Sequence, residues 1–291
     1  MVGPDGRKSY IVRMLIKCGA RITKPGPNLG FRFDEPEGPL EIAFHPFEQE
    51  EGFEVPIPRG LAVRAVGSAR SLDEAVNEFS AEAAGLTGVL SLSANAHVPY
   101  PTVERAYPCR AVDGRRDFFQ RFVPRVEGWP TQGRRIHVAG TGAIMSQLAD
   151  HPERSRLFRA IGQYQQALAF FSPGRELGAI AHFFMSVEAL TKAFIRGELG
   201  DPSLPNNVLA DRWGIRVKDL DREVRLRLIF SGDARCYTNL KEASDGLEHG
   251  YSDFHELREF AKLADHKRVA SYVRSAIFRL LDLPEPYQSE L

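Results

Sequence analysis

The stretch ELGAIAHFFMSVEALTKAFI, residues 176–195, decides how the second half of this chain folds. Its apolar side chains recur on every side of a helix with 3.6 residues per turn, so they cannot all lie on one stripe. A helix of this kind is buried among its neighbours, and we expect it to be the central helix of a bundle. His182, Glu188 and Lys192 would then need partners, because an unpaired buried carboxylate is costly. Glu188 is thus either a structural hydrogen-bonding residue, which is the simpler reading, or a catalytic one.

The rest of the chain after about residue 150 also reads as helices. Apolar residues recur at helical spacing, and Pro, Gly or capping residues stand at the ends of the runs. A looser segment, residues 201–220, follows the central helix. The expected helices cover residues 152–171, 173–195, 221–230, 233–249 and, as one long helix, 253–281.

The first half consists of short β-rich runs separated by Pro and Gly clusters. One helix interrupts them: Ser71 can cap it, and apolar residues recur from Ala75 to Leu90. The runs are SYIVRMLIKC (9–18), GFRFD (30–34), PLEIAFHPF (39–47), GLAVRAVG (60–67), ERAYPCRAV (104–112), DFFQRFVPRV (117–126) and RRIHVAG (134–140).

These two patterns predict an α+β chain. We expect a mixed β-sheet module with one packed helix over residues 1–145 and an all-α bundle over residues 146–291. GTGAIMS, residues 140–146, lacks the Lys of a P-loop and the third Gly of a dinucleotide fingerprint. We therefore expect it to be the hinge between the two domains.

The composition excludes several function classes. Lys and Arg number 38 and Asp and Glu number 38, and this balance argues against a broad nucleic-acid-binding surface, though not against a local groove. The three cysteines are scattered and lack metal-type spacing, as expected of reduced thiols in a cytoplasmic protein. No segment approaches the length of a membrane span, and no Gly-x-Ser-x-Gly elbow occurs. We expect a cytoplasmic protein without a cofactor, a metal or a membrane partner.

Two of the expected helices carry a family resemblance. AHFFMSVEALTKAFI on the buried helix, followed by SDGLEHG (residues 244–250) near the end of a later helix, resembles the HEPN superfamily of helical bundles, in particular its Apea-like group. The whole chain is similar to methylamine utilisation proteins of the MauJ type. The resemblance implies a homodimer formed through the C-terminal bundle, here residues 233–281, and an RNA or protein partner.

Active HEPN members cleave RNA without metal, using an arginine that precedes a histidine by a few residues. His249 matches the histidine, and Asp245 matches the polar residue that commonly follows the arginine. The candidate arginine positions hold Glu242, Ala243 and Ser244. Because cleavage develops negative charge on the phosphate, a missing guanidinium and nearby carboxylates disfavour the reaction.

We therefore expect a non-catalytic accessory or interaction protein, in which His249 is hydrogen-bonded inside the bundle near Glu188. The alternative is a metal-independent ribonuclease of stress or phage defence, with His249, Asp245 and Glu188 as candidate catalytic residues. It would need a displaced arginine, for which the candidates are Arg225, Arg227 and Arg258.

A metal-dependent hydrolase is a further alternative. Two carboxylates and two histidines occur between residues 248 and 255, and such side chains suit zinc or manganese. Their spacing crosses a helix end and matches no ligand pattern. The simpler interpretation is a corner, in which Gly250 ends one helix and Asp253 caps the next.

Overall fold

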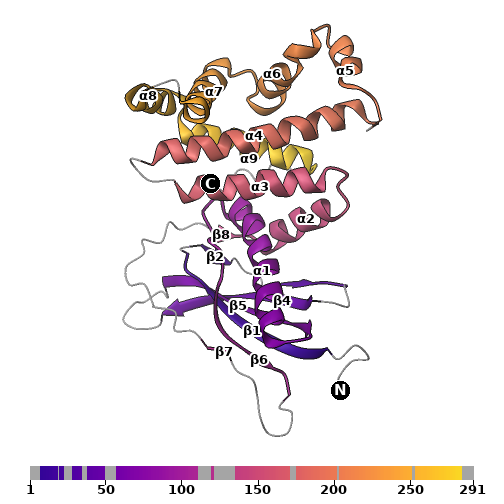
Figure 1. Cartoon of the computed structure of the whole chain (residues 1–291), viewed down its shortest axis with the longest axis vertical. Coiled ribbons are helices and arrows are strands. Elements are labelled where there is room, and N and C mark those ends of the chain that lie inside the picture. Colours follow the sequence, from indigo (N-terminus) through magenta and orange to yellow (C-terminus); the bar gives the residue numbers. More distant parts are fainter. Residues whose placement is uncertain are drawn as a thin grey trace. The chain divides into compact units, whose positions relative to one another are not determined.

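The structure is a computed structural model of the whole chain, shown in Figure 1. It describes residues 7–18, 20–22, 28–34, 38–49, 57–110, 119–120, 135–170, 175–201, 203–250 and 253–283. The chain divides into two compact units, Met1–Thr141 and Gly142–Leu291. The first contains a sheet and one long helix, and the second is helical.

The main sheet of the first unit has the strand order β3-β4-β5-β1-β6-β7. Every neighbouring pair in it is antiparallel. A separate parallel pair joins two short strands, β2 and β8. The prediction of a mixed sheet is therefore wrong. The main sheet is antiparallel, and the parallel pairing lies outside it. The strands are β1 (Lys8–Ile16), β2 (Arg21–Ile22), β3 (Leu29–Arg32), β4 (Gly38–Gln49), β5 (Ile57–Ala69), β6 (Thr102–Pro108), β7 (Phe119–Gln120) and β8 (Arg135–Ile136).

One face of this sheet packs against helix α1 (Leu72–Ala94), which contacts β1, β4, β5 and β6. Ser71 caps the helix as predicted, since its side chain accepts a hydrogen bond from the backbone N–H of Glu74. Alternate residues of β1, from Tyr10 to Ile16, are buried, whereas Ser9 before them and Arg13 between them are exposed. This alternation gives the sheet a covered face and an open face.

The second unit is an all-helical bundle around α4 (Glu176–Leu199). α4 contacts α3 and each later α-helix from α5 to α9, and most of its residues are buried, so the prediction of a central helix is confirmed. The other elements are α2 (Val138–Ala149), α3 (Arg154–Ala169), α5 (Asn206–Arg212), a 3₁₀ helix (Val217–Asp219), α6 (Leu220–Val224), a π-helical turn (Arg225–Ile229), α7 (Ala234–His249), α8 (Phe254–Ala264) and α9 (His266–Leu280).

The structure corrects two expectations about the helices. The Gly-rich passage expected to be a hinge lies within α2, which continues through the boundary between the two units. The expected long helix over 253–281 is broken at Asp265, whose backbone has φ 55° and ψ 91°. The Asp265 side chain accepts a hydrogen bond from the N–H of Lys267 and so caps α9.

By length and composition, α4 could cross a membrane, so the expectation that no segment approaches a span is corrected. About two thirds of its most apolar window is buried inside the helical unit. The core helix of a soluble protein has these properties, and the structure is compatible with one.

Candidate functional site

The corner between α7 and α8 has the geometry expected of a helix end and a helix start. Gly250 adopts the left-handed conformation, with φ 66°, and its N–H donates to the carbonyl of Gly246 at 3.0 Å. Asp253 accepts hydrogen bonds from the N–H groups of His255 and Glu256, at 2.8 and 2.9 Å. The corner interpretation is confirmed for Gly250 and Asp253. Tyr251 and Ser252 lie outside the described residues.

His249 does not lie inside the bundle, and the expectation that it does is wrong. The buried stripe of α7 runs through Cys236, Leu240 and Ala243, which recur at helical spacing. Glu248 and His249, in the last turn of α7, lie away from this stripe and are exposed to solvent. His249 is instead a basic residue in the last turn of α7, where it complements the helix dipole.

Glu188 is exposed as well, with 55% of its side chain accessible, so the expectation of a buried carboxylate is also wrong. Met185, Glu188 and Lys192 follow one another at helical spacing and form a narrow exposed strip along the mostly buried middle of α4. The apolar pattern of α4 predicted burial correctly for most of the helix. The strip remains exposed to solvent because no described side chain covers it completely.

Asp245 is engaged within its own helix. Its carboxylate forms an ion pair with Lys241, one turn earlier, and this hydrogen bond raises the pKa of the lysine. Ala243 and Ser244, two of the positions where the HEPN resemblance would place an arginine, are buried. A side chain at either position points into the bundle.

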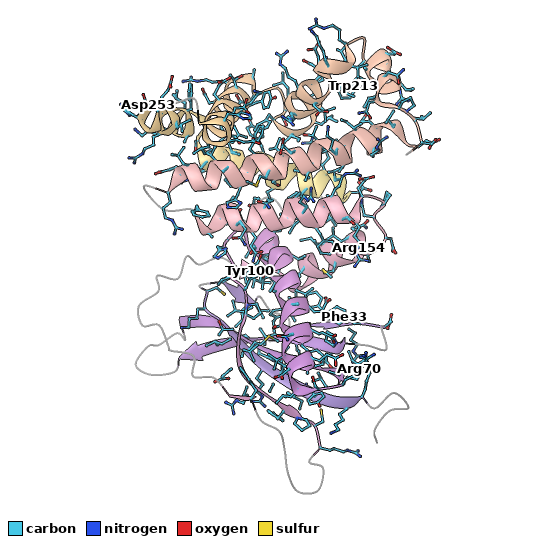
Figure 2. The ribbon with its side chains drawn as sticks, viewed as in Figure 1. Phe33, Arg70, Tyr100, Arg154, Trp213 and Asp253 are labelled. Atoms are coloured by element: carbon cyan, nitrogen blue, oxygen red, sulfur yellow. The ribbon has the colours of Figure 1, made fainter. Side chains whose placement is uncertain are left out.

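Two of the three candidate replacement arginines are held elsewhere. Arg227 pairs with Glu223 at 3.0 Å and lies over the ring of Trp213. Figure 2 shows Trp213 and Asp253 at opposite ends of the layer formed by α5 to α8, so Arg227 lies far from the corner. Arg258, the third candidate, is exposed on α8, a helix that packs against α7.

Arg225 forms a cluster that the sequence did not predict. Its side chain is only 11% exposed, and its Nε donates to the hydroxyl of Thr191 at 3.2 Å. The guanidinium lies over the ring of Phe184, and its Nη2 stands 3.9 Å from Glu188. A neighbouring ion pair joins Lys192 to Asp221 at 2.7 Å.

This cluster links α4 to the segment that contains α6 and the π-helical turn. Such turns are often found at functional sites, but each charge here already faces an opposite charge. A structural cross-link explains all of these contacts. The sequence does show charged residues in the strip of α4 and basic residues in the π-helical turn, and these could have suggested a cross-link. Which of them pair depends on how the two segments pack, and the sequence does not show that.

The three candidate catalytic residues therefore have separate places in the bundle: Asp245 pairs with Lys241, Glu188 pairs with Arg225, and His249 lies at the end of α7. Across the described parts of the chain, no group of three or more His, Cys, Asp or Glu side chains is arranged to hold a metal ion. The catalytic roles of these residues stay predictions.

Comparison of the chain with protein-family models, curated proteins and solved structures gave no match. The resemblance to HEPN bundles therefore rests on the quoted residues alone.

Proposed function

We propose that this chain is a non-catalytic accessory or interaction protein, built on a degenerate HEPN-like bundle that forms a homodimer in the cytoplasm. The observation that carries the proposal is the last turns of α7. Buried Ala243 and Ser244 occupy candidate arginine positions, and Asp245 is neutralised by Lys241. A phosphate near His249 would find no arginine in the last three turns of α7 to stabilise its charge.

Metal-independent ribonuclease activity is the second candidate, because His249 and Arg258 are both exposed on helices that pack together. The deciding experiment incubates the purified protein with single-stranded and structured RNAs, with and without EDTA. We expect no cleavage by the wild type. Cleavage that persists in EDTA and is lost in both His249→Ala and Arg258→Gln would replace the proposal with the ribonuclease.

Self-association through residues 233–281 is the second part of the proposal. Leu247 of α7 and Leu263 of α8 are exposed by 37% and 48%, which favours a contact that covers them. We expect light scattering at tens of micromolar to give the mass of a dimer, and Leu263→Lys to give a monomer. Val217→Lys, which changes an equally exposed apolar residue on the 3₁₀ helix, is the control and should leave the mass unchanged. A wild-type monomer would contradict dimer formation.

A further inference from the structure

Three arginines stand side by side across the middle of the sheet. Arg13 of β1 is paired in register with Arg64 of β5 on one side and with Arg105 of β6 on the other. Directly opposite residues on antiparallel strands have Cα atoms about 4.5–5.5 Å apart. We call Arg64, Arg13 and Arg105 the arginine row.

The arginine row lies on the open face of the sheet. Val12 and Met14 beside Arg13, and Val63 and Ala65 beside Arg64, are buried on the face that packs against α1. Ala106, which follows Arg105 on β6, is buried as well, whereas Glu104 before it stands where the register of β6 against β1 shifts. Because side chains alternate along a strand, the arginines point the other way. Arg13 is exposed, and Arg105 keeps 42% of its side chain accessible.

Three like charges directly opposite one another destabilise a sheet, and arginine stays charged at any physiological pH. Within the described residues, the only carboxylate paired with the row is Glu104, at 3.7 Å from Arg105. Both partners are more than 40% exposed, so this pair offsets little of the repulsion. The Nε of Arg105 is also buried without a hydrogen-bond partner among these residues. The row thus has more positive charge than the described protein neutralises.

Apolar side chains border the arginine row on both sides. In the next rank along the strands, Ile11 pairs with Val66 and with Tyr107. In the rank on the other side, Leu15 pairs with Ala62. All five side chains are half-buried, so part of each remains accessible on the open face.

We propose that this open face binds a single strand of nucleic acid, with phosphates at the arginine row and a base against Tyr107. Guanidinium groups form bidentate hydrogen bonds with phosphate, and consecutive phosphates of an extended strand can meet neighbouring arginines. An aromatic ring next to a basic row suits a base, which stacks on such rings regardless of sequence. An acidic peptide would use the arginines but gain nothing comparable from the tyrosine ring.

The chain has no net charge, so attraction must come from the local row. If three phosphates are engaged, the log of the affinity should fall with the log of the salt concentration with a slope of about −2. Between 50 and 200 mM salt this slope corresponds to a loss of about 20-fold. The proposal concerns the sheet unit and does not depend on whether the helical bundle is catalytic.

The test is fluorescence anisotropy of a labelled single-stranded oligonucleotide of mixed sequence with the full-length protein. We expect binding that weakens with salt as calculated, and a variant carrying Arg13→Gln, Arg64→Gln and Arg105→Gln that has lost it. Arg13→Lys keeps the charge but not the fork-shaped donor, and should bind at an intermediate level. Arg235→Gln removes an exposed arginine of α7 and is the matched control, expected to bind like wild type.

Tyr107 tests the stacking step separately. Tyr107→Leu should weaken binding by about 5-fold or more, and Tyr107→Phe should retain it, because only the ring is needed. Thermal unfolding of each variant checks that it folds; removal of like charge should leave the stability of Arg13→Gln equal or higher. Absence of binding at 50 mM salt, or equal losses in Arg13→Gln and Arg235→Gln, would overturn the proposal. The proposal would also be overturned if polyglutamate competed for the face as well as unlabelled oligonucleotide does and Tyr107→Leu had no effect on binding.

Discussion

Asp233 should be one of the residues on which the helical unit depends most. Its Oδ1 accepts the N–H of Cys236 at 3.0 Å and so caps α7. Its Oδ2 accepts the hydroxyl of Tyr272, on α9, at 3.1 Å and pairs with Arg268 at 2.8 Å. The carboxylate is 13% exposed and therefore joins the start of α7 to α9 in a largely buried position.

The cost of Asp233→Ala follows from these contacts. Loss of an N-cap costs about 1 kcal/mol, and loss of a hydrogen bond to a charged group about 1.5–3 kcal/mol. The exposed guanidinium of Arg268 adds little, because water screens the pair. We expect the free energy of unfolding of the helical unit to fall by about 2–4 kcal/mol, and its Tm by roughly 5–15 °C. Asp233→Asn, which retains a capping oxygen, should lose less.

The assay is chemical denaturation followed by far-UV circular dichroism, for Asp233→Ala, Tyr272→Phe and the double variant. The two changes should be coupled, because each removes one partner of the same hydrogen bond. Asp253→Ala is the matched control, since the hydrogen bonds of that residue within the described part of the chain are local ones that cap α8. It should cost less and show no coupling to Tyr272→Phe. Strictly additive losses, or a stability of Asp233→Ala equal to wild type, would refute the reasoning.

Three further predictions concern other parts of the structure. Burial lowers the pKa of His182, so the folded chain takes up a proton less readily than the unfolded chain. The His182 imidazole should not affect stability above pH 6.5, and stability should fall as the pH drops from 6.5 through the folded pKa of His182. Denaturation measured between pH 7.5 and 5 should show a smaller loss of stability in His182→Gln than in the wild type. Burial raises the pKa of Cys18 to about 11 and that of Cys236 to about 12, so iodoacetamide should modify the half-buried Cys109 first. Prompt labelling of Cys236, detected by mass spectrometry, would contradict this. Gly67→Ala would place a Cβ 2.2 Å from the carbonyl oxygen of Gly38 and 2.8 Å from Phe79, and thermal unfolding should show a loss of about 3 kcal/mol. Gly30→Ala is the control and should be nearly neutral, because the space around Gly30 is open.

Much of the fold could be predicted from the sequence because the signals are local. Alternation in the strands, the Ser71 cap and the apolar pattern of α4 each lie within a few residues, and the structure has them where expected. The break at Asp265 was missed, although Asp before a helical run is a usual capping signal. No Gly or Pro marks that break, so an unbroken helix was the simpler interpretation of the sequence.

The candidate site was predicted less well, because the direction of a side chain on a helix depends on which neighbours cover it. His249 and Glu188 lie on the expected helices but on their solvent sides, and Arg225 meets Glu188 only because the π-helical turn packs against α4. Helical periodicity sets the relative directions of residues along one helix. It does not say which direction faces the core when nearly every face is apolar.

By itself, the sequence determined the kinds of element, their order, the central place of α4 and the neutrality of the chain. Only the tertiary structure decided the strand order and register, and with them the arginine row. Arg13, Arg64 and Arg105 come from strands far apart in the chain, and each looks like an ordinary exposed residue of its own strand. Antiparallel pairing brings them together because register is set by the buried face of the whole sheet, and shifting one strand by a residue would turn its arginine into the core.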